Sequence, residues 1–194
     1  VNVDENPRDM ADALVGAGID VIVTHPQHPD DNPALYTLIG GVFGRAAQAA
    51  TLADEYRRTR ARVGEPASWP AKRVLYLIWK DPWMAIQGET YIGGCLGLVN
   101  WHTVAPGADQ TLTGDAARYP EITLDEATLS NVDLVLFSSE PYAFTGSDIA
   151  EFKEAHPAHA QKAHLIDGEM TSWYGSRATR GLDYIATFAS GILR

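Results

Sequence analysis

Three aromatic side chains and one arginine follow the ends of apolar segments in this sequence. They are Trp83, Trp173, Tyr174 and Arg177. Aromatic rings are flat and rigid and bury a large apolar area, so they would suit a macrocycle or an aryl chelate. Arg177 could bind a carboxylate or phosphate of such a ligand with paired hydrogen bonds. The alternative for the aromatic residues is core packing, and the alternative for Arg177 is an ion pair with Asp167 or Glu169.

Apolar segments with the character of strands precede these residues. They are residues 74–79, 133–139 and 164–167. Their length and composition are typical of strands buried on both faces of an α/β sheet. Ligands bind at the carboxyl ends of the strands in such sheets, so we expect the following loops to face a ligand. Trp79 lies inside the first segment, where we expect it to pack in the core.

The chain around these loops predicts a lobe of three layers. After a linker at residues 64–70, strand-like runs alternate with helical patterns as far as Arg194. Such alternation predicts a sheet that is covered by helices on both faces. We therefore assign residues 64–194 to a C-terminal α/β lobe in which the sheet lies between two layers of helices.

The amino-terminal part predicts a smaller α/β unit. Residues 1–3 could be the end of a strand, residues 7–15 have helical spacing, and residues 19–24 are a β-branched run typical of a buried strand. This β-α-β unit is all that precedes the next predicted helix. We assign residues 1–32 to a partial N-terminal lobe.

A long helix is predicted next. Residues 33–62 carry a broad apolar stripe at helical spacing. At 1.5 Å per residue, a helix of this length would span roughly 45 Å, which is longer than one lobe is wide. We therefore predict that residues 33–63 form a backbone helix between two lobes. Gly40, Gly41 and Gly44 are interpreted as points of close packing or a bend.

Composition excludes some classes of partner. The formal net charge is −10, and the arginines within residues 57–62 lie at helical spacing opposite apolar positions. No basic face for nucleic acid is therefore predicted. No apolar run approaches the roughly 20 residues of a membrane span, and no signal peptide is visible. Cys95 is the only cysteine, which excludes an internal disulfide.

Metal binding and catalysis are alternatives that the residues favour less. His25 with His28, and His156 with His159, have a chelating spacing but lie in proline-containing turns, so we interpret them as polar loop histidines. The carboxylates and hydroxyls that could be assembled into a catalytic set are Glu89, Glu121, Glu140, Glu169, Ser172 and Ser176. No catalytic sequence motif accompanies them. We predict no catalytic residue and no metal site built from side chains.

Several segments of the second half, taken in order, resemble a known family. They are YLIWKDPWM (residues 76–84), TYI (90–92), RYPEITLDE (118–126), DLVLFSSEPYAF (133–144) and DGEMTSWYGSR (167–177). Together they resemble the substrate-binding proteins of ABC importers that have a helical backbone between their lobes. Proteins of that family carry cobalamin, ferric siderophores, haem or bare metal ions.

The resemblance implies an extracytoplasmic protein, periplasmic or lipid-anchored at the cell surface, with two α/β lobes joined by a long helix. Its ligand is expected to be an iron or cobalt chelate, with no covalently bound cofactor. The aromatic residues and Arg177 named above are expected to line one wall of the ligand site. The expected partner is an ABC permease. Glu140 in the second lobe and Glu5 in the first are the carboxylates expected to dock onto it.

The first lobe departs from the family's pattern. Nothing here matches the family's longer amino-terminal portion, so we expect the first lobe to be incomplete. Its sheet edge and the inner face of the helix would then be partly uncovered, and a homodimer through that surface is a further hypothesis. The alternative function is a transport-incompetent α/β domain of the same fold that acts as a sensor or an enzyme accessory.

Overall fold

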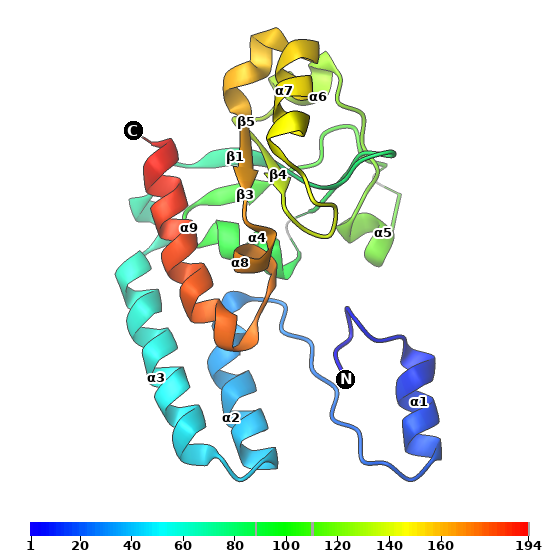
Figure 1. The fold of residues 1–194 in the computed structure, drawn as a ribbon, viewed down its shortest axis with the longest axis vertical. Helices are drawn as coiled ribbons and strands as arrows, with labels where there is room; N and C mark the ends of the chain where they lie inside the picture. The colour runs from blue at the N-terminus through cyan, green and yellow to red at the C-terminus, as the bar shows by residue number, and fades with distance from the viewer. Residues whose placement is uncertain (88, 110, 194) are drawn as a thin grey trace.

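A mostly parallel β-sheet forms the centre of the protein in the computed structural model, which describes residues 1–87, 89–109 and 111–193 (Figure 1). The strands are β1 (Lys72–Trp79), β2 (Met84–Ala85), β3 (Trp101–Thr103), β4 (Leu134–Ser138) and β5 (Ala163–Ile166). The order along the sheet is β2-β1-β4-β5, and β3 also pairs with β1. β3 and β4 run parallel to β1, and β5 runs parallel to β4, whereas β2 is antiparallel to β1.

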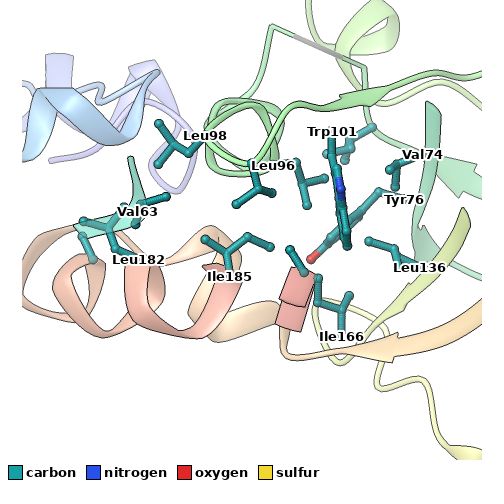
Figure 2. Packing of buried hydrophobic residues seen from close by; sticks show 14 of the residues in the cluster. Val63, Val74, Tyr76, Leu96, Leu98, Trp101, Leu136, Ile166, Leu182 and Ile185 are labelled. Carbon is teal, nitrogen blue, oxygen red and sulfur yellow. The ribbon is translucent and has the colours of Figure 1, made fainter. Parts of the chain in front are cut away.

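Helices cover both faces of this sheet. The α-helices are α1 (Arg8–Gly16), α2 (Asn32–Val42), α3 (Ala46–Val63), α4 (Tyr91–Gly97), α5 (Asp115–Arg118), α6 (Glu126–Ser130), α7 (Gly146–Ala155), α8 (Gly168–Ser172) and α9 (Ala178–Ile192). Short 3₁₀ turns are η1 (Pro29–Asp31), η2 (Pro66–Ser68), η3 (Pro157–Lys162) and η4 (Gly175–Arg177). Alternate strand residues enter two cores: Tyr76 packs with Trp101 and Ile185 on one face (Figure 2), and Leu75 packs with Phe152 on the other. The three-layer prediction for the second lobe is confirmed.

The register of the parallel strands brings their carboxyl ends together. Leu77 of β1 lies opposite Phe137 of β4, and Phe137 lies opposite Leu165 of β5. The three predicted strands are confirmed, and β1 and β4 are buried on both faces over most of their length. β5 is not buried on both faces, because Leu165 is 41% exposed. The prediction for Trp79 is wrong, because this side chain ends β1 and is 41% exposed. Its ring lies edge-on against Tyr142, with the centroids 5.8 Å apart.

The single helix predicted over residues 33–62 is wrong, because the chain reverses between α2 and α3. The two helices lie side by side as a hairpin (Figure 1). Gly44 has φ +62°, a left-handed conformation that ends α2 and that glycine adopts without strain. A Cβ on Gly40 would lie 2.4 Å from the Cβ of Ala49, so glycine permits the close approach of the two helices. The glycines thus mark a reversal and close packing within a hairpin.

The hairpin packs on the second lobe. α3 contacts α9, and Arg62 donates to a carboxylate oxygen of Asp183 at 3.0 Å. Residues 46–63 therefore share a core with the sheet. The division of the chain at residues 32/33 and 63/64 stays a prediction.

The N-terminal segment, residues 1–27, contains α1 but little sheet. Asn2 and Thr24 form an isolated parallel bridge, and Ile19 and Val23 are exposed. The predicted helix is confirmed, whereas the predicted buried strand at residues 19–24 is wrong. Residues 1–3 pair with the end of this stretch and no named strand of the described residues does, so Ile19, Ile22 and Val23 stay exposed. In Figure 1, α1 stands apart from the α2–α3 hairpin.

Within the described ranges, every helix is too short or too polar to span a lipid bilayer.

Candidate ligand-binding site

A cavity of about 660 Å³ lies at the carboxyl ends of β4 and β5. Its lining residues are Ser139, Glu140, Phe144, Leu165, Ile166, Asp167, Glu169 and Tyr184. The cavity is broadly open to solvent, and its volume falls within the range of about 300–1,000 Å³ that small-molecule sites occupy. Its position also matches the strand edge at which open α/β sheets bind ligands, and where the sequence predicted a site.

Gly168 allows the two strand ends to meet at this cavity. A Cβ at this position would lie 2.8 Å from the backbone nitrogen of Glu140 and 2.9 Å from its Cβ. Glycine therefore lets the loop after β4 pack directly against the start of α8. The backbone N–H of Gly168 also donates to the hydroxyl of Ser139 at 2.9 Å, and Asp167 accepts a hydrogen bond from the N–H of Met170 at 3.2 Å as the cap of α8.

Glu140, Glu169, Trp173 and Arg177, called here the Trp173 cluster, form one connected set beside the cavity. The indole N–H of Trp173 donates to Oε2 of Glu140 at 2.7 Å, and the Trp173 side chain is still 45% exposed. The guanidinium of Arg177 lies over the same indole, 4.5 Å from the ring centroid. Arg177 also pairs with the carboxylate of Glu169. Arg177 was expected either to bind a ligand or to pair with Asp167 or Glu169, and the structure shows the ion pair with Glu169.

The other two predicted residues contact different neighbours. Trp83 is half-buried and stacks on Phe144, with the ring centroids 5.9 Å apart and the planes 6° from parallel. Phe144 lines the cavity, so Trp83 supports that wall from behind. Tyr174 lies 5.6 Å from the ring of Tyr91. The four residues predicted to form one wall therefore do not lie together. Trp173 and Arg177 are in contact, whereas Trp83 packs on Phe144 and Tyr174 packs on Tyr91.

Tyr174 faces the N-terminal segment. Burial raises the pKa of its hydroxyl, and the nearby carboxylates of Asp4 and Glu5 raise it further. Asp4 in turn joins the segment to the second lobe, because its carboxylate lies 3.1 Å from the guanidinium of Arg118 and 3.4 Å from Nε2 of His25. Asp4 and Arg118 are 114 positions apart in the chain, and no local pattern predicted this ion pair.

The two predicted docking carboxylates differ in their surroundings. Glu140 is half-buried and bonded to Trp173 within its own lobe. Glu5 is exposed near the start of the chain, where its backbone N–H donates to the side chain of Asn2 at 3.3 Å. The contact of Glu140 with Trp173 was missed because the two residues are 33 positions apart. The pairing of β4 with β5 is the signal that could have revealed it.

Several of the histidines and serines that were weighed for metal binding or catalysis have structural contacts. His28 accepts a hydrogen bond from the N–H of Asp30 at 3.1 Å as the cap of η1, and Nε2 of His159 lies 3.0 Å from Glu126. The hydroxyl of Ser172 donates to the backbone carbonyl of Gly168 at 2.7 Å. No cluster of three or more potential metal ligands occurs in the ranges 1–87, 89–109 and 111–193. The cavity and the exposed indole of Trp173 beside it provide a surface for binding.

Comparison with known proteins finds matches among solved structures, at the level of the fold. No protein-family model and no curated protein sequence matches the chain. The periplasmic vitamin B12-binding protein BtuF of Vibrio cholerae matches with a TM-score of 0.76 at 13% identity, over 100% of this chain and 74% of that one. An ABC transporter substrate-binding protein from Listeria monocytogenes matches with a TM-score of 0.64 at 17% identity, over 92% and 71%. The chain has the fold of ABC-importer substrate-binding proteins.

The periplasmic haem-binding protein RhuT from Roseiflexus sp. RS-1 has the same fold. It matches with a TM-score of 0.74 at 13% identity, over 100% of this chain and 75% of that one. The mixed α/β class and the type of receptor predicted from the sequence are therefore confirmed at the level of the fold. All three of these proteins are binding proteins.

Proposed function

We propose that this protein binds an iron or cobalt chelate outside the cytoplasm and delivers it to an ABC importer. The observation that carries the proposal is the cavity at the carboxyl ends of β4 and β5, beside an indole that is 45% exposed and fixed by Glu140. An exposed aromatic ring held on a rigid frame binds a flat ligand at a low entropic cost. Solved proteins of the same fold that bind vitamin B12 and haem support this choice of ligand class.

Fluorescence titration tests the proposal. Cyanocobalamin, haemin and a ferric hydroxamate siderophore are each added to the protein, and we expect one of them to quench its tryptophan emission with saturation. Trp173→Ala should weaken that binding, because it removes the exposed ring. Trp79→Ala is the matched control, since Trp79 has similar exposure but packs on Tyr142 and lies outside the Trp173 cluster. Absence of saturable binding for all three chelates contradicts the proposed function.

Docking to the permease is proposed to use Glu5. This carboxylate is exposed, whereas Glu140 already accepts the indole N–H of Trp173. A surface ion pair contributes about 1 kcal/mol or less, so it changes the association rate and its salt dependence more than the affinity. Glu5→Lys should therefore slow association with the permease at low salt and leave chelate binding unchanged. Glu140→Lys should instead weaken chelate binding, and the opposite pattern would restore Glu140 as the docking residue.

A homodimer is the remaining part of the proposal. Apolar side chains are exposed at the end of the α2–α3 hairpin, where Phe43 is 70% exposed beside Val42, Ile39 and Leu38. The accessible surface is 10446 Å², compared with about 9,000 Å² for a compact protein of this mass. A second copy that covers the hairpin would remove apolar area from water. Multi-angle light scattering should show a dimer that Phe43→Ser converts to a monomer, and a monomeric parent protein would exclude it.

A further inference from the structure

The charged groups at the cavity bear on the kind of chelate that fits it. Three carboxylates line it, from Glu140, Asp167 and Glu169. Of the described residues that form the lining, none is a lysine, an arginine or a histidine. The cation beside them is Arg177, which reaches the cavity through its contacts with Trp173 and Glu169. At neutral pH the three carboxylates and Arg177 together carry a formal net charge of −2.

Arg177 is already engaged by the protein. Its guanidinium pairs with Glu169 and lies over the indole of Trp173, so both its charge and one of its faces have partners. A ligand carboxylate that took the place of Glu169 would leave that carboxylate without its cation, and one that bound beside Glu169 would meet its negative charge. Exchanging one carboxylate partner for another gains little, because the guanidinium is already paired. Arg177 therefore does not act as an anchor for an anionic ligand.

Two other basic residues, Lys80 and Arg180, do not offset the negative charge of the cavity. Lys80 is held by Asp148 at 3.3 Å and by Glu151 at 2.7 Å, so its own surroundings are net negative. Arg180 lies on α9 one turn before Tyr184 and is not among the lining residues. An indole face next to carboxylates also attracts cations, through the quadrupole of the ring.

From this arrangement we infer that the site selects uncharged or cationic chelates and rejects anionic ones. The inference rests on the proposed function, because it names the charge class of the chelate bound at the same site. Uncharged corrinoids and esterified porphyrins fall within the favoured class. Free haem, with its two propionates, and anionic ferric catecholates fall outside it.

Pairs of chelates that differ only in charge test the inference. The first pair is cyanocobalamin and its monocarboxylate, in which one side-chain amide is replaced by an acid. The second pair is haemin and its dimethyl ester, both presented in the same non-ionic detergent. Unit charges about 6 Å apart that are partly screened change an affinity by about three- to tenfold. We therefore expect the uncharged member of the pair that binds to have a Kd at least about threefold lower than the acid.

Charge substitutions extend the test to the residues involved. Glu169→Gln removes one carboxylate and frees Arg177, so the preference for the uncharged chelate should shrink or reverse. Glu151→Gln is the control, because this carboxylate pairs with Lys80 and does not line the cavity. It should leave the ratio of the two Kd values unchanged. Circular dichroism of each variant checks that the fold is retained.

The outcomes separate the two claims. Tighter binding of the acid than of the uncharged form by the parent protein overturns the charge inference and leaves the proposed function in place. An unchanged Kd ratio in Glu169→Gln also overturns the inference. If neither pair binds but the ferric hydroxamate siderophore does, an anionic ferric catecholate that binds as tightly overturns the inference. If none of these chelates binds, the proposed function is contradicted and the inference with it.

Discussion

Gly168→Ala should loosen the binding site and destabilise the fold at the same time. The added methyl carbon would lie 2.6 Å from the hydroxyl of Ser138 and 2.8 Å from the backbone nitrogen of Glu140. Carbon atoms do not approach backbone nitrogen this closely, so the loop after β4 must move away from α8. The hydrogen bond from Trp173 to Glu140, now 2.7 Å, depends on that loop. The substitution therefore tests whether close packing at one glycine holds the indole in place.

The expected loss of stability follows from the size of the overlap. Overpacking by one methyl group costs about 1–3 kcal/mol. Alanine gains at most about 1 kcal/mol over glycine in a helix, so a full gain would leave a net loss of up to about 2 kcal/mol. Urea denaturation followed by circular dichroism measures this change. The emission of Trp173, obtained as the difference from a Trp173→Phe partner of each protein, should shift toward that of a solvated indole.

Gly146→Ala provides the matched control. Gly146 is the first residue of α7, as Gly168 is the first residue of α8, but a Cβ at Gly146 meets nothing within 4 Å. Its free energy of unfolding should stay within about 0.5 kcal/mol of the parent or rise slightly. Equal stabilities for the two alanine variants, with unchanged Trp173 emission in Gly168→Ala, would refute the packing argument.

Three further substitutions test other parts of the structure. Gly40→Ala should have a free energy of unfolding about 1–3 kcal/mol lower than Gly41→Ala, because both substitutions gain helix propensity but only the methyl at position 40 would overlap α3; urea denaturation compares the two variants. Asp4→Asn removes the ion pair with Arg118 and should speed hydrogen exchange in residues 1–27, most clearly at low salt. The backbone N–H of Thr128 donates to the carboxylate of Asp125 and lowers the pKa of that carboxylate, so the hydrogen bond stabilises the fold fully above about pH 4 and less as the pH falls below that. Asp125→Asn should remove this part of the acid dependence of the unfolding free energy, and an unchanged pH profile would count against the argument.

The sheet could be predicted from the sequence because its strands are strong local signals. The runs around Tyr76 and Phe137 are apolar over their whole length, and a strand that is buried on both faces requires this. The carboxyl ends of parallel strands then meet by geometry alone, so the place of the site could be predicted as well. Trp79 shows the limit of this reasoning, because an apolar run does not show at which residue burial ends.

The hairpin could not be predicted from periodicity. Val42 and Phe43 match the helical pattern of apolar residues, so the predicted stripe continues through them into α3. Both side chains are nevertheless exposed in the structure. The reversal depends on one backbone conformation, at Gly44. A single glycine at that position fits a bend in a long helix as well as it fits a turn between two helices.

The Trp173 cluster required tertiary structure. From the sequence, Arg177 could either bind a ligand or form an ion pair with a neighbour such as Glu169. Side chains eight positions apart can meet only when the chain between them turns, and the sequence did not show this turn. The hydrogen bond from Trp173 to Glu140 joins loops that follow neighbouring strands. Sequence patterns identified the residue types that could bind a ligand, whereas the register of the sheet decided which of them meet.

Isothermal titration of the parent protein, Trp173→Ala and Trp79→Ala with the chelate that binds tests the central claim most directly. A Trp side chain that is 45% exposed offers roughly 100 Å² to a ligand, and covering about half of this area contributes about 1.3 kcal/mol. The account therefore predicts that Trp173→Ala raises the Kd about tenfold, while Trp79→Ala changes it by less than about twofold. Equal Kd values for Trp173→Ala and the parent protein would contradict the claim that the cavity at the ends of β4 and β5 is the ligand site.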